Sequence, residues 1–132
     1  MPSIIQEVWI FTKDGIPIVE YCKEDCINES LLGGFLSAIK TFSKEISGEG
    51  IESFTMNEYK FIIHTCCNNH ALVVCRAPID IKDKKVENFC KIIGKMFEES
   101  YTPEELKKWS GDCSHFDNFK NKLENYFKLA NL

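Results

Sequence analysis

Length and charge exclude several classes of protein. The 132 residues, 44% of them hydrophobic, are enough for one domain with a buried core. A formal net charge of −4 repels nucleic acid. Arg76 is the lone arginine, although arginine is preferred for bidentate phosphate and base contacts. We therefore expect a single domain over residues 1–132 that binds no nucleic acid.

The signals that direct a protein into a membrane are also missing. No apolar run approaches the roughly 18–20 residues of a transmembrane helix, and Met1-Pro2-Ser3 leads directly into a strand pattern without the regions of a signal peptide. The expected location is the cytoplasm, with at most peripheral membrane association through partners. Without a secretory context, the seven cysteines are expected to be mostly buried, reduced thiols.

The first predicted element is a β-hairpin. Apolar and β-branched runs at Ile4–Phe11 and Ile16–Cys22 flank Asp14-Gly15, a dipeptide typical of tight hairpin turns. The first strand is apolar at consecutive positions, which indicates cover on both faces. The second strand carries Pro17, which has no N–H for the strand ladder, so this strand is expected at a sheet edge.

A long amphipathic helix follows. Asn28 is the expected N-cap, the helix spans Glu29–Ser47, and Gly48-Glu49-Gly50 ends it. At 100° per residue its apolar positions form one stripe, which consists of Leu31, Leu32, Phe35, Leu36, Ala38, Ile39, Phe42 and Ile46.

Three more strands and a second long helix come next. The strands are predicted at Ile51–Met56, Tyr59–Cys67 and Ala71–Cys75, with a turn at Asn68-Asn69-His70 between the last two. Asp83 is expected to cap the helix. Its apolar face is predicted to consist of Val86, Phe89, Cys90, Ile93 and Phe97.

The chain ends in further helical segments. Thr102-Pro-Glu-Glu105 is a capping box with proline at the first helical position, which starts a short helical turn. Ser114 and Asp117 have the same spacing and are predicted to form a second capping box before the last helix. The apolar stripe of that helix is Phe116, Phe119, Leu123, Tyr126 and Phe127.

Together these elements predict an α/β (α+β) fold with the topology β-β-α-β-β-β-α-α. Short turns join the last three strands into an antiparallel meander, and the more polar second and third strands are expected at the edges. The predicted five-stranded antiparallel sheet therefore has the order 2-1-5-4-3. The first helix lies alone on one face and the later helices on the other, which gives a three-layer α-β-α sandwich.

In element order and in several local patterns the chain resembles a longin domain from Gln6 to Phe127. The patterns are Phe11-Thr-Lys-Asp-Gly-Ile-Pro-Ile18, Leu32-Gly-Gly-Phe-Leu-Ser-Ala-Ile-Lys-Thr-Phe42, and Tyr59-Lys-Phe-Ile-Ile63 followed by Leu72-Val-Val-Cys75. The chain is most similar to the first longin domain of the Mon–Ccz exchange-factor and Fuzzy families. The related roadblock fold usually begins with a helix, whereas here a strand comes first.

The longin resemblance implies binding rather than catalysis, with no cofactor. Longin and roadblock domains serve as dimerising platforms for small GTPases, or as trafficking adaptors and regulators of SNARE proteins. The expected function is a non-catalytic scaffold that binds or regulates a small GTPase, with itself or another longin or roadblock protein as its dimer partner. The alternative is a trafficking or coat-like adaptor, or a SNARE-regulating module that binds a peptide.

Two cysteine patterns leave a different class of protein open. Cys22-x-x-x-Cys26 could be half of a metal site, although no second Cys/His pair follows at a familiar spacing. His64 and Cys66 lie two apart in a predicted strand and could form a thiolate–imidazole couple, although nothing marks an orienting carboxylate or an oxyanion hole. A cytosolic thiol enzyme or metal sensor is the third interpretation, and no catalytic, cofactor or metal residue is assigned.

The predicted partner surface combines the first helix with the edge strand. Gly33 and Gly34 point away from the apolar stripe, and each costs about 0.5–1 kcal/mol relative to alanine inside a helix. Close approach of another backbone at these positions would explain the two glycines. A small loss of helix stability that the fold tolerates near the start of the helix would explain them as well. An uncovered edge strand tends to pair with another chain. The predicted contact residues are Gly33, Ser37, Lys40, Thr41 and Lys44 on the helix and Ile16, Ile18 and Glu20 on the strand.

Overall fold

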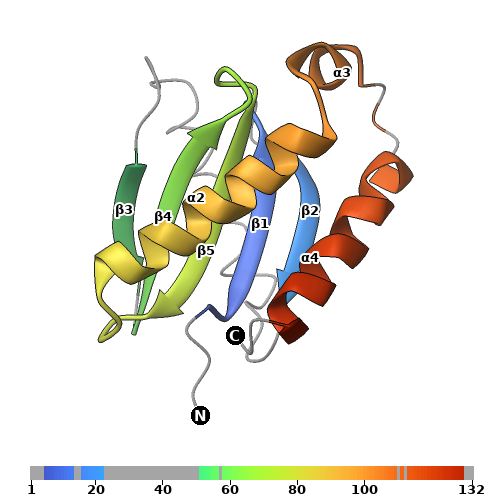
Figure 1. Ribbon diagram of the computed structural model, residues 1–132. Coiled ribbons are helices and arrows are strands. Elements are labelled where there is room, and N and C mark those ends of the chain that lie inside the picture. The colour runs from blue at the N-terminus through green and yellow to red at the C-terminus, as the bar shows by residue number, and fades with distance from the viewer. Residues whose placement is uncertain are drawn as a thin grey trace.

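The computed structural model describes residues 5–13, 16–22, 51–56, 58–109, 111 and 113–129. The predicted helix Glu29–Ser47 and the Asp14-Gly15 turn lie outside these residues. None of the described helices is both long enough and apolar enough to cross a membrane. The elements (Figure 1) are β1 Glu7–Thr12, β2 Pro17–Cys22, β3 Ile51–Met56, β4 Tyr59–Cys66, β5 Ala71–Pro78, α2 Asp83–Ser100, α3 Pro103–Lys108, the 3-10 helix η1 Cys113–Phe116 and α4 Asp117–Leu129.

The described strands form an antiparallel sheet in the order β2-β1-β5-β4-β3. The two more polar strands, β2 and β3, are its edges. Between β1 and β2 the register shifts, because Ile10 pairs with Val19 and Phe11 pairs with Pro17. Ile18 is thereby the extra residue of a β-bulge, a feature that is common at sheet edges.

β1 is buried along its whole length. α2 and α4 lie over one face of the sheet (Figure 1). On the other face, the side chains of Trp9, Phe11 and Val74 are at most 2% exposed. The sheet is therefore buried on both faces, as the doubly apolar first strand predicts. The third layer of the predicted sandwich is the first helix. This helix lies outside the described residues, so the third layer stays a prediction.

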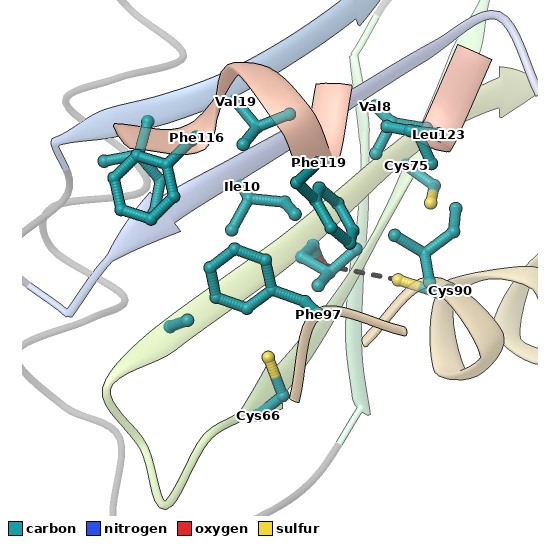
Figure 2. Packing of buried hydrophobic residues seen from close by; sticks show 14 of the residues in the cluster. Val8, Ile10, Val19, Cys66, Cys75, Cys90, Phe97, Phe116, Phe119 and Leu123 are labelled. Atoms are coloured by element: carbon teal, nitrogen blue, oxygen red, sulfur yellow. Dashed lines mark hydrogen bonds between the residues drawn. The ribbon is translucent and has the colours of Figure 1, made fainter. Parts of the chain in front are cut away.

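The main hydrophobic cluster lies between the sheet and these helices (Figure 2). The ring of Phe97 on α2 meets the ring of Phe119 on α4 edge to face, with centroids 5.2 Å apart. This contact joins the two helices above the sheet. Phe89 is half-buried at the margin of the cluster. The other predicted positions of the α2 face are fully buried, namely Val86, Cys90, Ile93 and Phe97.

α2 approaches β4 closely at Gly94. A Cβ atom at this position would lie 2.8 Å from Cδ2 of His64 and 3.7 Å from Cβ of Cys66. The first distance is shorter than any Cβ contact that a folded protein tolerates without a shift. Glycine therefore lets the helix rest directly on the imidazole ring of His64.

One predicted helix start is confirmed, one is wrong, and one differs in its bounds. The Thr102 hydroxyl accepts a hydrogen bond from the Glu105 N–H at 3.2 Å, and the Glu105 carboxylate accepts one from the Thr102 N–H at 3.3 Å, so the capping box is present. α2, in contrast, begins at Asp83 itself, after Lys82, without a side-chain cap. α4 begins at Asp117 directly after η1, so Ser114 lies within the 3-10 helix.

Two further features differ from the predictions. β5 continues past Cys75 to Pro78, because Arg76 pairs with Glu7 on one side and Phe61 on the other. Cys22 is disulfide-bonded, an exception to the expectation that most of the cysteines are reduced thiols. The prediction holds for the buried free thiols of Cys66, Cys67, Cys75 and Cys90.

Candidate interaction surface

The edge strand β2 is the part of the predicted partner surface that the structure describes. Ile16, just before the strand, is 46% exposed, and Glu20 is exposed within it. Ile18 is only 6% exposed and belongs to the hydrophobic cluster, because the bulge allows two consecutive side chains to be buried. The side chain of Ile18 is therefore a core group and not a partner contact. The other predicted contacts, which lie outside the described residues, are Gly33, Ser37, Lys40, Thr41 and Lys44.

α4 packs against β2 (Figure 1). The ring of Tyr21 stacks on the ring of Phe127, with centroids 4.7 Å apart and planes inclined by 19°. Burial, and to a lesser extent the Glu124 carboxylate, raises the pKa of the Tyr21 phenol, so this group stays neutral at physiological pH. A second chain that paired along β2 would meet α4 as well as the strand.

A buried ion pair joins the central strands β1 and β5. Nη2 of Arg76 lies 2.7 Å from Oε1 of Glu7, and both side chains are 1% exposed. The guanidinium also lies over the ring of Tyr59, 4.4 Å from its centroid. This pair was not predicted, because the predicted strand ended at Cys75, one residue before Arg76. A predicted strand that continued to Arg76 would have placed this residue opposite Glu7, as the observed register does.

A second ion pair ties β4 to the start of α2. Nζ of Lys60 lies 2.6 Å from Oδ1 of Asp83, and the same ammonium donates a hydrogen bond to the Ile81 carbonyl oxygen. The Lys60 side chain is 9% exposed, so its charge requires such partners. Asp83 is therefore the partner of a distant lysine rather than the cap of its own helix. No local sequence pattern indicates that Asp83 pairs with Lys60.

The described members of the two cysteine patterns do not converge on an open site. α2 covers His64 and Cys66 at Gly94, and Cys66 is 2% exposed. Cys22 is disulfide-bonded, so its sulfur is not a free thiolate ligand. Among the residues that the structure describes, no group of three or more His, Cys, Asp or Glu side chains is arranged to hold a metal ion.

The thiol of Cys90 on α2 is fully buried. Its Sγ–H donates to the carbonyl oxygen of Val73 at 3.4 Å (Figure 2). Burial raises the pKa of this thiol well above its ordinary value, and the neighbouring Cys75 and Cys66 raise it further. A thiol that stays protonated is a weak nucleophile and a weak metal ligand. The geometry of Cys90 is that of a core residue.

No family model matches the chain, and no curated protein does. Solved structures do match. The gliding protein MglB from Thermus thermophilus has a TM-score of 0.48 at 13% identity, and the match covers 67% of this chain and 71% of that one. MglB in a tetrameric arrangement has a TM-score of 0.52 at 9% identity, and the match covers 74% of this chain and 80% of that one.

At 9% identity, the match to MglB in the tetrameric arrangement shows that the two chains share a fold. The fold is roadblock/longin-like. This confirms the predicted fold only at the level of the combined longin and roadblock group. The narrower similarity to the Mon–Ccz and Fuzzy families stays a prediction.

Proposed function

We propose that this protein is a non-catalytic scaffold that binds or regulates a small GTPase and works as a dimer. The observation that carries the proposal is the roadblock/longin-like fold, because longin and roadblock domains serve as dimerising platforms for small GTPases. MglB, a protein of similar fold, has been solved in a tetrameric arrangement, which supports self-association.

The edge strand β2 supports the dimer part of the proposal. β2 pairs with β1 on one side, and no other described strand lies beside it. An exposed strand edge is a template for pairing with another chain. The side chains of Glu20 within β2 and of Ile16 just before it are accessible. The partner would be a second copy of the chain or another longin or roadblock protein.

The scaffold would act on a GTPase through differential contacts. The GTPase brings the nucleotide, the magnesium ion and the hydrolytic residues. The scaffold binds one conformation of its switch region more tightly than the other and so shifts their populations. The predicted helix surface, which consists of Gly33, Ser37, Lys40, Thr41 and Lys44, is the second part of the proposed contact region. Such a role places the protein in the cytoplasm and at membranes only through its partners.

Affinity capture from the source lysate tests the GTPase part. The protein is immobilised and incubated with GDP in one run and with a non-hydrolysable GTP analogue in another. We expect a small GTPase in the eluate, enriched in one of the two nucleotide states. Absence of any small GTPase from both eluates would contradict the proposal.

Two variants then locate the contact. Ser37→Arg and Thr41→Arg place a large charged side chain on the predicted helix surface, and each should weaken the captured complex at least tenfold while the fold is retained. If both variants fold and bind the captured GTPase normally, the helix surface is not the contact.

A further inference from the structure

One end of the sheet carries a pocket of about 230 Å³. It is lined by residues at the end of β1 and just before β2, in the turn after β4, and in and after the helix α3. The hairpin contributes Lys13 and Ile16, the turn contributes His70, and α3 with the following residue contributes Leu106, Lys107 and Trp109. The three segments are far apart in the sequence, so only the fold brings these side chains together.

Hydrogen bonds hold each wall of the pocket in place. The Lys13 N–H donates to the His70 carbonyl oxygen at 3.2 Å, which joins the hairpin to the turn. The Ile16 N–H donates to the Thr12 hydroxyl at 3.2 Å. The third wall, α3, starts at the capping box of Thr102. The hairpin wall and the turn wall are therefore joined before a ligand binds, which lowers the entropic cost of binding.

Two lysines, Lys13 and Lys107, line this pocket, although the whole chain has a net charge of −4. Partial burial lowers the pKa of His70, and the charges of Lys13 and Lys107 lower it further, against a weaker opposite effect of Glu104. Two lysines on different elements thus act on the same imidazole ring. An anionic group placed beside His70 would be attracted by both ammonium groups.

The walls between the charges are apolar. Ile16 is 46% exposed and Leu106 is 8% exposed, and Trp109 is half-buried. A volume of about 230 Å³ lies below the roughly 300–1,000 Å³ of small-molecule sites, but it accommodates one or two side chains. An inorganic anion would leave the apolar walls unused. A peptide that carries a carboxylate next to an aliphatic side chain would use both kinds of surface.

We propose that this pocket binds an acidic peptide segment of a partner protein. A carboxylate of the peptide would lie between Lys13 and Lys107, and an adjacent aliphatic side chain would pack on Ile16 and Trp109. The inference goes beyond the scaffold role proposed above and does not depend on it. A GTPase could fail to bind while the peptide binds, and the reverse outcome is equally distinguishable.

The test is an NMR titration of the full chain, labelled with ¹⁵N, with a defined probe. The probe is the blocked peptide Asp-Glu-Leu-Asp-Glu, and its matched control is the neutral peptide Asn-Gln-Leu-Asn-Gln. We expect saturable shifts of the Lys13, His70 and Lys107 amides and of the Trp109 indole with the acidic peptide alone. The apparent affinity should fall as salt is added, because exposed charges are screened.

Paired variants give the control. The double variant Lys13→Ala/Lys107→Ala should weaken binding of the acidic peptide at least tenfold. Lys84→Ala/Lys91→Ala removes two exposed lysines from α2 and should leave the affinity unchanged. Absence of saturable shifts up to millimolar peptide would overturn the proposal. Equal binding of the neutral peptide, or equal loss in the two double variants, would also overturn it.

Two further probes exclude other ligands. Inorganic phosphate that reproduced the same shifts at the same affinity would indicate a small-anion site and overturn the peptide proposal. Vesicles of phosphatidylserine that bound through Lys13 and Lys107, while the acidic peptide did not bind, would indicate a membrane surface and overturn it as well. Binding of the peptide without these two effects would support the proposal.

Discussion

The carboxylate of Glu7 in β1 lies 2.7 Å from the guanidinium of Arg76 in β5, and both side chains are 1% exposed. The two residues are direct partners in the register of the central strands. Removing such charges from water costs several kcal/mol per ion, which only close pairing offsets. A slip of one residue would separate the charges and turn one of them to the other face. The pair therefore contributes to the register of the two strands.

Removal of one partner of this pair should destabilise the fold strongly. We expect Arg76→Met to lower the free energy of unfolding by about 3–5 kcal/mol, because Glu7 would keep a buried charge without its guanidinium. The double variant Glu7→Leu/Arg76→Met removes both charges and should be more stable than Arg76→Met alone. Urea denaturation at pH 7, followed by circular dichroism, measures both. A double variant that is less stable than the single variant would contradict this account.

Gly94 on α2 provides a second test of packing. Gly94→Ala adds a Cβ atom 2.8 Å from Cδ2 of His64, and overpacking of this kind typically costs about 1–3 kcal/mol. The better helix propensity of alanine returns about 1 kcal/mol. We expect a net loss of up to about 2 kcal/mol in the free energy of unfolding.

Two controls separate the clash from the effect of helix propensity. Asn88→Ala changes an exposed position of the same helix and should be neutral or slightly stabilising. In the His64→Ala background the imidazole is absent, so Gly94→Ala should no longer destabilise the protein. If the loss persists in that background, the contact with His64 is not its cause.

The pKa of Cys90 predicts a pH dependence of stability. Burial raises the pKa of this thiol in the folded state, whereas the unfolded thiol ionises near about pH 8.5. The stabilising effect is therefore fully present below that pH and is lost as the pH rises above it, because the unfolded state then binds fewer protons. The loss approaches about 1.4 kcal/mol for each pH unit.

Cys90→Ala should remove this contribution. Urea denaturation of both proteins at pH 7, 8 and 9 would show a shallower decline in the variant, which starts from a lower stability because the core loses a buried group. In the folded wild-type protein, Cys90 should also resist labelling by a thiol reagent at pH 8. An identical decline in the two proteins would rule out Cys90 as the titrating group.

The features that depend on residues close together in the chain were predicted correctly. Pro17 indicated that β2 lies at an edge, and the pattern from Thr102 to Glu105 indicated a helix start, because both depend on residues close in the chain. The role of Asp83 was missed because its partner Lys60 comes from another element. The burial of Ile18 was missed because a bulge in the pairing with β1 produces it.

The candidate sites also differ in whether the local sequence could predict them. The exposure of Ile16 and Glu20 agrees with the predicted edge strand. The pocket around His70 could not be predicted, because its residues come from three segments that only the folded sheet brings together. Basic residues such as Lys13 and Lys107 carry no distinguishing signal in the sequence. Their significance comes from sharing one pocket with apolar walls.

The last prediction concerns the assembly. If β2 pairs with a second chain, Glu20→Lys changes an exposed side chain at the interface and should weaken the dimer at least tenfold without lowering the stability of the monomer. Thr55→Lys is the matched control, because Thr55 is exposed on the opposite edge strand β3. Multi-angle light scattering over a range of concentrations measures both variants. We expect the wild type and Thr55→Lys to be dimers at a concentration at which Glu20→Lys is a monomer.

A wild-type chain that stays monomeric, both alone and mixed with longin or roadblock partners, would contradict the dimer. Equal dissociation of the two variants would contradict the assignment of the interface to β2, because a charge on either edge would then have the same effect.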